Sequence, residues 1–234
     1  MKKIINFGLA SAAAILITQT AHSSALIERD DVSKTIRVVG RIVYSGAALT
    51  DEIAEASTRE IQDMWSEFPT DVKIGSTSYR VEFEIDHVIA GRQTLINPDS
   101  CGYNFIQIIN KTNAGDRSYY EGLGSRNGVF YTSDALGTST TAAHEFGHGL
   151  MLDHNDGDQR NSAVPGIMFA RGTLVRSEFQ WDPRAAAGAA GGTINPQYRK
   201  VRSVDIQAIP FSSVRNKLSK SVGCLGDGKA KKIK

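Results

Sequence analysis

Three histidines in one short stretch constrain the fold more than any other feature of this 234-residue chain. His144 and His148 stand four residues apart, so on an α-helix both imidazoles lie on one face and can bind the same metal ion. Glu145 directly follows the first of them, within reach of a water molecule on that ion. His154 lies ten residues after His144, so the chain must leave the helix and turn back to bring a third nitrogen to the metal. The spacing predicts a zinc site with three protein ligands and one open coordination position.

This stretch resembles the HExxHxxGxxH motif of the metzincin zinc endopeptidases. The resemblance implies that Zn²⁺ is bound by His144, His148 and His154. It further implies that Glu145 is the general base for a zinc-activated water that hydrolyses a peptide bond. The fold that it implies is an α/β (α+β) fold with a mixed twisted sheet, an active-site helix and a loop-rich C-terminal part that ends in a helix.

One position of the motif departs from the family. Met151 stands where the family has glycine, which adopts the left-handed backbone conformation that ends the helix sharply. Any other residue costs roughly 1 kcal/mol or more there, unless the turn shifts to Gly149 or is built differently. The placement of His154 therefore depends on this turn, and Asp153 is an alternative third ligand.

A second family mark follows fourteen residues after the last histidine. The segment 164–168 (VPGIM) resembles the Met-turn of metzincins, with Met168 as the residue that packs beneath the metal. Some metzincins have a tyrosine two residues later, whereas this chain has Ala170, so no tyrosine is expected to assist at the metal. Residues 203–209 resemble the C-terminal helix of the matrixin branch, which we therefore expect to be the most similar branch.

Acidic residues downstream of the motif offer two alternatives. Glu178 is a candidate third ligand of the thermolysin type, although the downstream helical motif of that branch is not visible around it. Carboxylates and amides at alternate positions suit calcium, but they lack the spacing of an EF-hand and are interpreted as solvated loop residues. These residues are Asp153, Asn155, Asp156 and Asp158.

The N-terminus has the pattern of a secretory signal peptide over residues 1–23. Two lysines precede an apolar stretch, residues 4–17, and small residues follow at cleavage-compatible spacing. The stretch is shorter than the roughly 20 apolar residues of a membrane span, so we expect a secreted or periplasmic protein without stable membrane association. After cleavage, Lys+Arg and Asp+Glu are equal at 25 each, which argues against nucleic acid as a partner. The basic run at residues 229–234 is interpreted as a solvated tail.

The two cysteines, Cys101 and Cys224, favour a disulfide because the chain is predicted to be exported. Closing so long a loop contributes about 4 kcal/mol in the chain-entropy model. Two buried free thiols are the alternative, since the sequence does not give the distance between them.

Hydrophobic patterning predicts an α/β half followed by a loop-rich half. Strands are expected over residues 35–43, 72–74, 79–89, 103–110 and 128–132, and a helix after the N-cap Thr50, ending before Pro69. The helix carries apolar residues from Ile53 to Phe68 at helical spacing, and His87 falls on the apolar face of the 79–89 strand as a core histidine. We divide the mature chain at residue 154 into a catalytic subdomain, 24–154, and a C-terminal subdomain, 155–234, that holds the Met-turn.

The sequence thus predicts a secreted zinc endopeptidase whose partner is a protein or peptide substrate. Residues 119–123 are the candidate edge strand along which an extended substrate would lie. Two alternatives stay open: a secreted zinc-containing binding module without turnover, and a toxin subunit that is active only in an assembly. Glu145 argues against the binding module, because a structural zinc site needs no base and closes its fourth position. The chain leaves room for only about a dozen residues of propeptide before the first strand.

Overall fold

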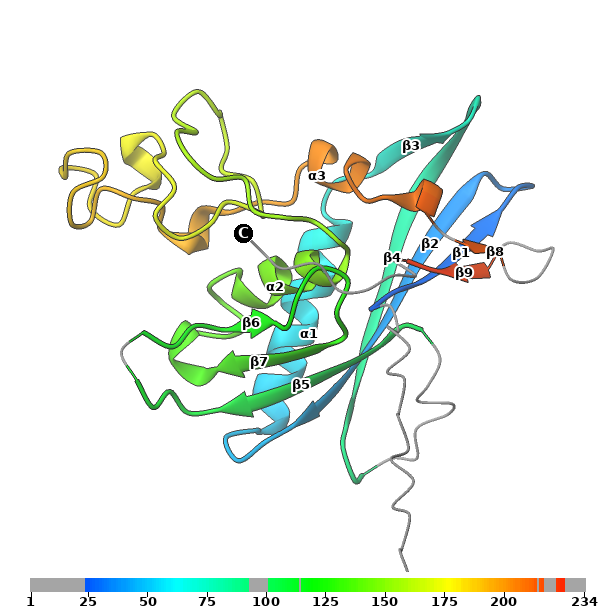
Figure 1. The fold of residues 1–234 in the computed structure, drawn as a ribbon, viewed down its shortest axis with the longest axis horizontal. Coiled ribbons are helices and arrows are strands. Elements are labelled where there is room, and N and C mark those ends of the chain that lie inside the picture. Colours follow the sequence, from blue (N-terminus) through cyan, green and yellow to red (C-terminus); the bar gives the residue numbers. More distant parts are fainter. Residues whose placement is uncertain (1–23, 93–100, 114, 214, 217–221, 226–234) are drawn as a thin grey trace, which may run out of the picture.

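A mixed, curled sheet forms the frame of the molecule (Figure 1). The computed structural model describes residues 24–92, 101–113, 115–213, 215–216 and 222–225, and nine strands lie within them. The central strand is β2 (Thr35–Ser45), which pairs in parallel with β4 (Thr77–Ile89) along one side. On its other side β2 pairs first with antiparallel β1 (Leu26–Asp30) and then with parallel β5 (Tyr103–Ile109). The predicted mixed α/β fold is confirmed.

Both ends of the sheet are closed by short strands. Next to β5 lie parallel β7 (Asn127–Tyr131) and then β6 (Tyr119–Tyr120), which is antiparallel to β7 and forms that edge. Beyond β1 lie β9 (Val222–Cys224) and β8 (Arg215–Asn216), while β3 (Thr70–Ile74) pairs only with β4 among the described strands. The sequence predicts no strand after 128–132, and this is wrong, because β8 and β9 bring the chain back to the sheet.

Helix α1 (Asp51–Ser66) follows the sequence signals closely. The Thr50 side chain accepts a hydrogen bond from the Ile53 backbone amide at 3.2 Å, and thus caps the helix. Ile61 and Trp65 are fully buried. Phe68, which the apolar periodicity includes, lies beyond the end of the helix and is 46% exposed, so the buried stripe stops one turn earlier than the pattern predicts.

Strand β4 shows the expected alternation of buried and exposed side chains except at its C-terminal end. Its buried positions are Tyr79, Val81, Phe83 and Ile85. His87 continues that register but is only half-buried, beside the ring of Tyr44. Val88 is buried instead, on the opposite face, in a small cluster with Val43 and Tyr103. The outer face of the sheet thus has an apolar cluster of its own.

The main core lies between the sheet and the helices α1 and α2 (Thr141–Gly149) (Figure 1). All nine residues of α2 are buried. Trp65 fixes the helix pair: its ring packs against Phe83 and Phe146, and its indole N–H donates to the Ala143 carbonyl at 3.1 Å. A helix buried on every side is positioned by packing rather than by its own propensity.

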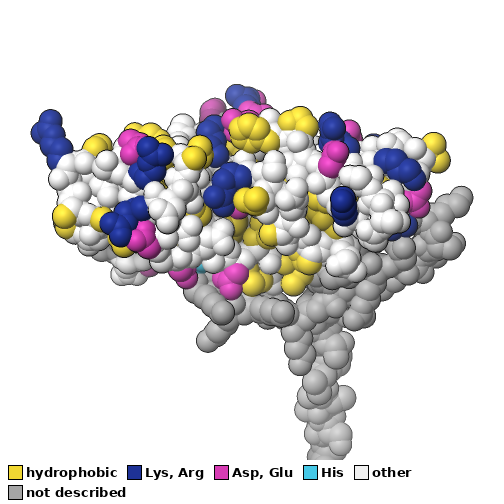
Figure 2. Space-filling model, turned by 90° about the horizontal axis from the view of Figure 1, so that it is seen from above, with side chains coloured by type: hydrophobic (Ala, Val, Ile, Leu, Met, Phe, Trp, Pro, Cys, Tyr) yellow, Lys and Arg dark blue, Asp and Glu magenta, His cyan; other side chains and the backbone are white. Residues whose placement is uncertain are grey.

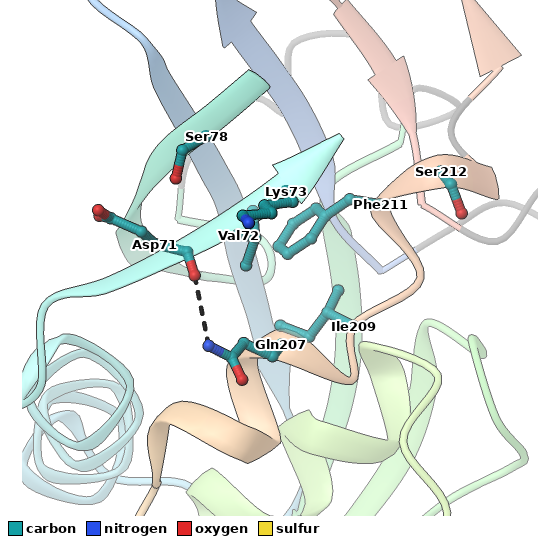
Figure 3. A pocket seen from close by; sticks show the side chains of 8 residues that line it. All are labelled: Asp71, Val72, Lys73, Ser78, Gln207, Ile209, Phe211 and Ser212. Atoms are coloured by element: carbon teal, nitrogen blue, oxygen red, sulfur yellow. Dashed lines mark hydrogen bonds between the residues drawn. The ribbon is translucent and has the colours of Figure 1, made fainter. Parts of the chain in front are cut away.

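The chain after α2 is mostly irregular. It contains the short 3₁₀ turns η2 (Ser177–Phe179) and η3 (Pro196–Tyr198) and the helix α3 (Ser203–Gln207). Between β3 and the segment that follows α3 lies a hollow of about 500 Å³, floored by Val72, Ile209 and Phe211 (Figure 3). The division of the mature chain into two subdomains at residue 154 stays a prediction.

The two cysteines form the expected disulfide. Cys101, just before β5, is bonded to Cys224 on β9, and their Cα atoms are 5.6 Å apart. Because β5 pairs with the central strand β2, the bond joins β9 to the middle of the sheet. The basic run at 229–234 and the predicted signal peptide, 1–23, lie outside the described residues.

Charge is mixed over the surface. On the face shown in Figure 2, Lys and Arg side chains alternate with Asp and Glu side chains, and hydrophobic side chains lie among them. Within the described ranges, no helix has the length and apolar character needed to cross a bilayer.

Candidate metal centre

Helix α2 ends in a left-handed turn built at Met151 itself. Met151 has φ 69°, the conformation for which the family uses glycine. The Leu152 amide donates to the Gly147 carbonyl and the Met151 amide to the His148 carbonyl, both at 3.0 Å. This is the Schellman pattern of helix termination. The departure from the motif therefore leaves the sharp turn in place, and the chain reverses towards the helix face that carries the histidines.

Replacing Met151 by glycine should therefore keep the site intact. The Met151 side chain stands against Gly124, which limits the gain from relieving its backbone strain. We expect Met151→Gly to raise the free energy of unfolding by up to about 1 kcal/mol and to leave zinc content unchanged. Met151→Val, with a β-branched side chain at positive φ, should lower it by about 1–2 kcal/mol. Urea unfolding and zinc analysis of both variants measure this; loss of zinc by the glycine variant would contradict it.

The three motif histidines converge through their Nε2 atoms. His144 Nδ1 lies 2.6 Å from the Ile167 carbonyl oxygen, and His148 Nδ1 lies 2.8 Å from the Leu152 carbonyl oxygen. A carbonyl only accepts, so each Nδ1 carries the proton and each Nε2 presents a lone pair. His154 Nε2 lies 3.2 Å from both of these Nε2 atoms. A tetrahedral ion with ligands at about 2.0–2.1 Å sets nitrogens about 3.3–3.4 Å apart, so the donor set fits zinc.

Burial keeps the two helix histidines neutral, as metal ligands must be. It lowers the pKa of His144 well below its usual value, and the nearby Arg199 guanidinium lowers that pKa further. Burial also lowers the pKa of His148 to about 4, against a smaller opposite effect of the bond to the Leu152 carbonyl. At neutral pH both imidazoles are therefore uncharged and available to a cation.

Glu145 is 7% exposed and follows the first ligand on the same helix. Burial raises the pKa of its carboxyl to about 8, while Arg199 and the Tyr120 backbone amide oppose that rise. A metal ion beside it adds positive charge and favours the ionised form. Glu145 is thus a buried carboxyl with a raised pKa, unlike a surface acid.

The segment around Met168 supports the histidines from below. Met168 is 2% exposed, and the preceding carbonyl, of Ile167, holds the His144 ring. The Met168 carbonyl also accepts from the Asn155 amide at 2.9 Å, just after the third histidine. This segment therefore contacts the chain at both ends of the ligand set, and its assignment as a Met-turn stays a prediction.

The comparison with protein families supports this geometry. Residues 13–155 match the model of the metallopeptidase family M12B, reprolysin-like. The chain belongs to the M12B reprolysin-like metallopeptidases. The match includes all three histidines and Glu145 and ends before Met168. It does not confirm the expected matrixin branch. No curated protein matched the chain.

In this reprolysin-like chain, the side chains considered as alternative metal ligands contact other residues. Glu178, on η2, pairs with Arg176 at 2.7 Å. Asp153 accepts the His154 backbone amide at 2.9 Å, and Asp158 pairs with Arg160. Within the described residues, the group of side chains that is close enough to hold one ion consists of the three motif histidines.

Gly147, inside the motif, makes room for Met168. A Cβ at this position would overlap the Met168 sulfur and press on Trp65. Gly→Ala in a helix interior ordinarily stabilises by about 0.5–1 kcal/mol. Here we expect Gly147→Ala to lower the free energy of unfolding by about 1–3 kcal/mol and to weaken zinc binding. The double variant Gly147→Ala/Met168→Ala should recover part of the lost stability and of the lost zinc binding. If Gly147→Ala has the same effect in the Met168→Ala background as in the wild type, the added methyl group does not act through Met168.

Two buried charged residues near the site were missed from sequence. Glu60 of α1 accepts the Ala143 amide at 3.1 Å and so caps the N-terminus of α2, whose own Thr140 makes no side-chain cap. Arg199, which follows η3, is 2% exposed. Glu60 sits beside the buried Ile61 in the sequence, which was a weak signal of burial; Arg199 had none.

Proposed function

We propose that this protein is a secreted zinc-dependent endopeptidase whose metal is bound by His144, His148 and His154. The observation that carries the proposal is the convergence of three Nε2 atoms, 3.2 Å from the third histidine to each of the others, beside a buried carboxyl group. Membership in the reprolysin-like family supports a peptidase and a protein or peptide substrate. The matrixin branch stays a prediction, based on residues 203–209.

The chemistry that zinc supplies when bound is a lowered pKa for a coordinated water, towards roughly 7, and polarisation of the scissile carbonyl. Glu145 accepts the proton of the attacking water and then delivers it to the departing amine. The Nδ1 bonds of His144 and His148 fix both rings, so that their Nε2 atoms stay aimed at one point. Met168 supports the ligands from below.

The substrate is proposed to lie along β6. This strand forms the edge of the sheet, and Tyr119 on it is 43% exposed. The Tyr120 backbone amide lowers the pKa of Glu145, so the edge and the proton-transferring group are neighbours. An extended peptide that pairs with β6 would bring a backbone carbonyl towards the metal.

Secretion is the remaining part of the proposal. A disulfide between Cys101 and Cys224 is compatible with an oxidising compartment, and the sequence pattern of residues 1–23 is that of a signal peptide. N-terminal sequencing of the exported protein tests this; a mature chain that begins near residue 24 is expected.

The proposal is tested by zinc content and by cleavage of a denatured-protein panel. The purified mature chain is expected to hold about one zinc, to cut, to stop after chelation and to resume when zinc is restored. His154→Ala should lose both zinc and cleavage. His87→Ala is the matched control, because this histidine lies on β4 outside the ligand set, and it should keep both.

Each other result has a defined meaning. Zinc bound by the wild type without cleavage of any substrate would favour a binding module or a subunit that needs an assembly. Zinc retained by His154→Ala would show that the third ligand is wrongly assigned, with Asp153 as the next candidate.

A further inference from the structure

Arg199 is a buried cation that forms no ion pair with another side chain in the described part of the chain. It is 2% exposed and among the largest fully buried side chains. Its Nε has no hydrogen-bond partner in the described part of the chain. Burial lowers the pKa of its guanidinium to about 10, so the group is charged at neutral pH. An unpaired buried charge is among the most unfavourable features a fold can contain, which points to a partner from outside the chain.

The backbone places this residue beside the metal centre. The Thr140 hydroxyl, at the start of α2, donates to the Pro196 carbonyl at 2.7 Å. The Lys200 amide donates to the Pro165 carbonyl at 2.9 Å, in the segment that leads to Met168. The segment that carries Arg199 is thus held between the active-site helix and the Met168 segment.

The carboxyl groups near Arg199 are already engaged within the chain. Asp134 is engaged by Arg171 at 3.0 Å and by the Ser118 amide and hydroxyl at 2.8 Å. Glu60 caps α2. Glu145 is the remaining carboxyl whose charge acts on Arg199, and it is assigned to proton transfer. A second carboxylate entering from the substrate would therefore meet a guanidinium whose Nε donor has no hydrogen-bond partner within the described residues.

We propose that Arg199 binds a carboxylate of the substrate close to the scissile bond and thereby sets specificity. The inference rests on the proposed function and names its substrate class. Guanidinium binds carboxylate through two parallel hydrogen bonds, and such charge-assisted bonds are strongest where water is excluded. The carboxylate belongs either to an aspartate or glutamate side chain or to the free C-terminus of a peptide.

Matched peptides test the proposal on the zinc-loaded protein. One series exchanges Asp for Asn and Glu for Gln at each position around a mapped cleavage site; a second compares free with amidated C-termini. We expect kcat/KM to be at least about tenfold higher for the acidic member at one position. Preference confined to the first series identifies a side chain, and preference confined to the second identifies the terminal carboxylate.

Variants assign the preference to Arg199. Arg199→Met should bring the ratio of kcat/KM for the acidic peptide to kcat/KM for its amide counterpart within about twofold of one. Arg199→Lys should keep part of the preference for the acidic peptide. Arg176→Met is the matched control, since it removes an exposed arginine from the same half of the chain. The unfolding midpoint of Arg199→Met should be equal to or above that of the wild type, because an unpaired buried charge is removed. An unchanged ratio in a folded Arg199→Met protein would overturn the proposal.

The kcat/KM ratios of the wild type alone test whether a substrate carboxylate is recognised, even if a variant does not fold. Ratios near one in both series overturn the inference, while cleavage that disappears in Glu145→Gln still supports the peptidase. Calorimetric binding of the uncut acidic and amide peptides to zinc-loaded Glu145→Gln gives a readout that needs no turnover, and the acidic peptide should bind at least about tenfold more tightly.

Discussion

Glu145→Gln is expected to bind zinc as the wild type does and to lose kcat by about 10²–10⁴-fold. Glutamine has nearly the same shape but cannot accept the proton of the attacking water. Glu145 is not one of the three converging ligands, so metal affinity should change little. Because the carboxyl is 7% exposed and burial raises its pKa to about 8, removing its charge should not lower the free energy of unfolding.

Three measurements on the purified variant check this: zinc per chain, single-turnover cleavage of one peptide, and urea unfolding. Glu55→Gln is the matched control, because Glu55 is exposed on α1, pairs with Arg59 and lies outside the ligand set. It should cleave within about twofold of the wild type. Cleavage by Glu145→Gln within tenfold of the wild type would assign the base to another residue. Loss of zinc would instead make Glu145 a ligand or a structural support.

The candidate metal site was readable from sequence because its geometry follows from helix periodicity and ligand number. Spacings of four and six residues are enough to bring three histidines together once a sharp turn lies between the second and the third. What the sequence left open was that turn. Met151 provides the left-handed conformation at its own energetic cost, and only the backbone shows that it does so. Propensity alone would have moved the turn to Gly149.

The supporting residues were not readable, because long-range packing determines them. Glu60 and Ala143 are separated by 83 residues, and only the docking of α1 on α2 makes them a cap. β1 (LIERD) lacks a strong strand pattern and forms because β2 and β9 provide partners on both sides. β8 and β9 are shorter than any periodicity can detect. Strand β4, with eleven predicted residues in clear alternation, was identified with nearly correct ends.

Because Glu60 has a raised pKa, it should make the free energy of unfolding fall as the pH rises. Most acids in folded proteins have a lowered pKa and the opposite effect. Burial raises the pKa of Glu60 from 4.5 to about 7, against the backbone amides at the start of α2 that favour its ionised form. Arg199 and the buried Tyr44 hydroxyl are the other titratable groups that interact with it. Below pH 4.5 the carboxyl is protonated in both states. Between pH 4.5 and 7 the unfolded chain releases this proton and the folded chain retains it, so the free energy of unfolding falls as the pH rises.

Glu60→Gln should remove that dependence. The amide oxygen can still accept from Ala143, and the side chain no longer ionises. From pH 4.5 to 8, the wild type should lose roughly 3 kcal/mol of unfolding free energy relative to the variant. Urea unfolding of both proteins at intervals across this range measures the difference, in which the other titrating groups cancel. Glu55→Gln, on the exposed face of α1, should follow the wild-type curve. A Glu60→Gln curve parallel to the wild type would show that Glu60 ionises at its ordinary pKa and that the cap carries a full charge at neutral pH.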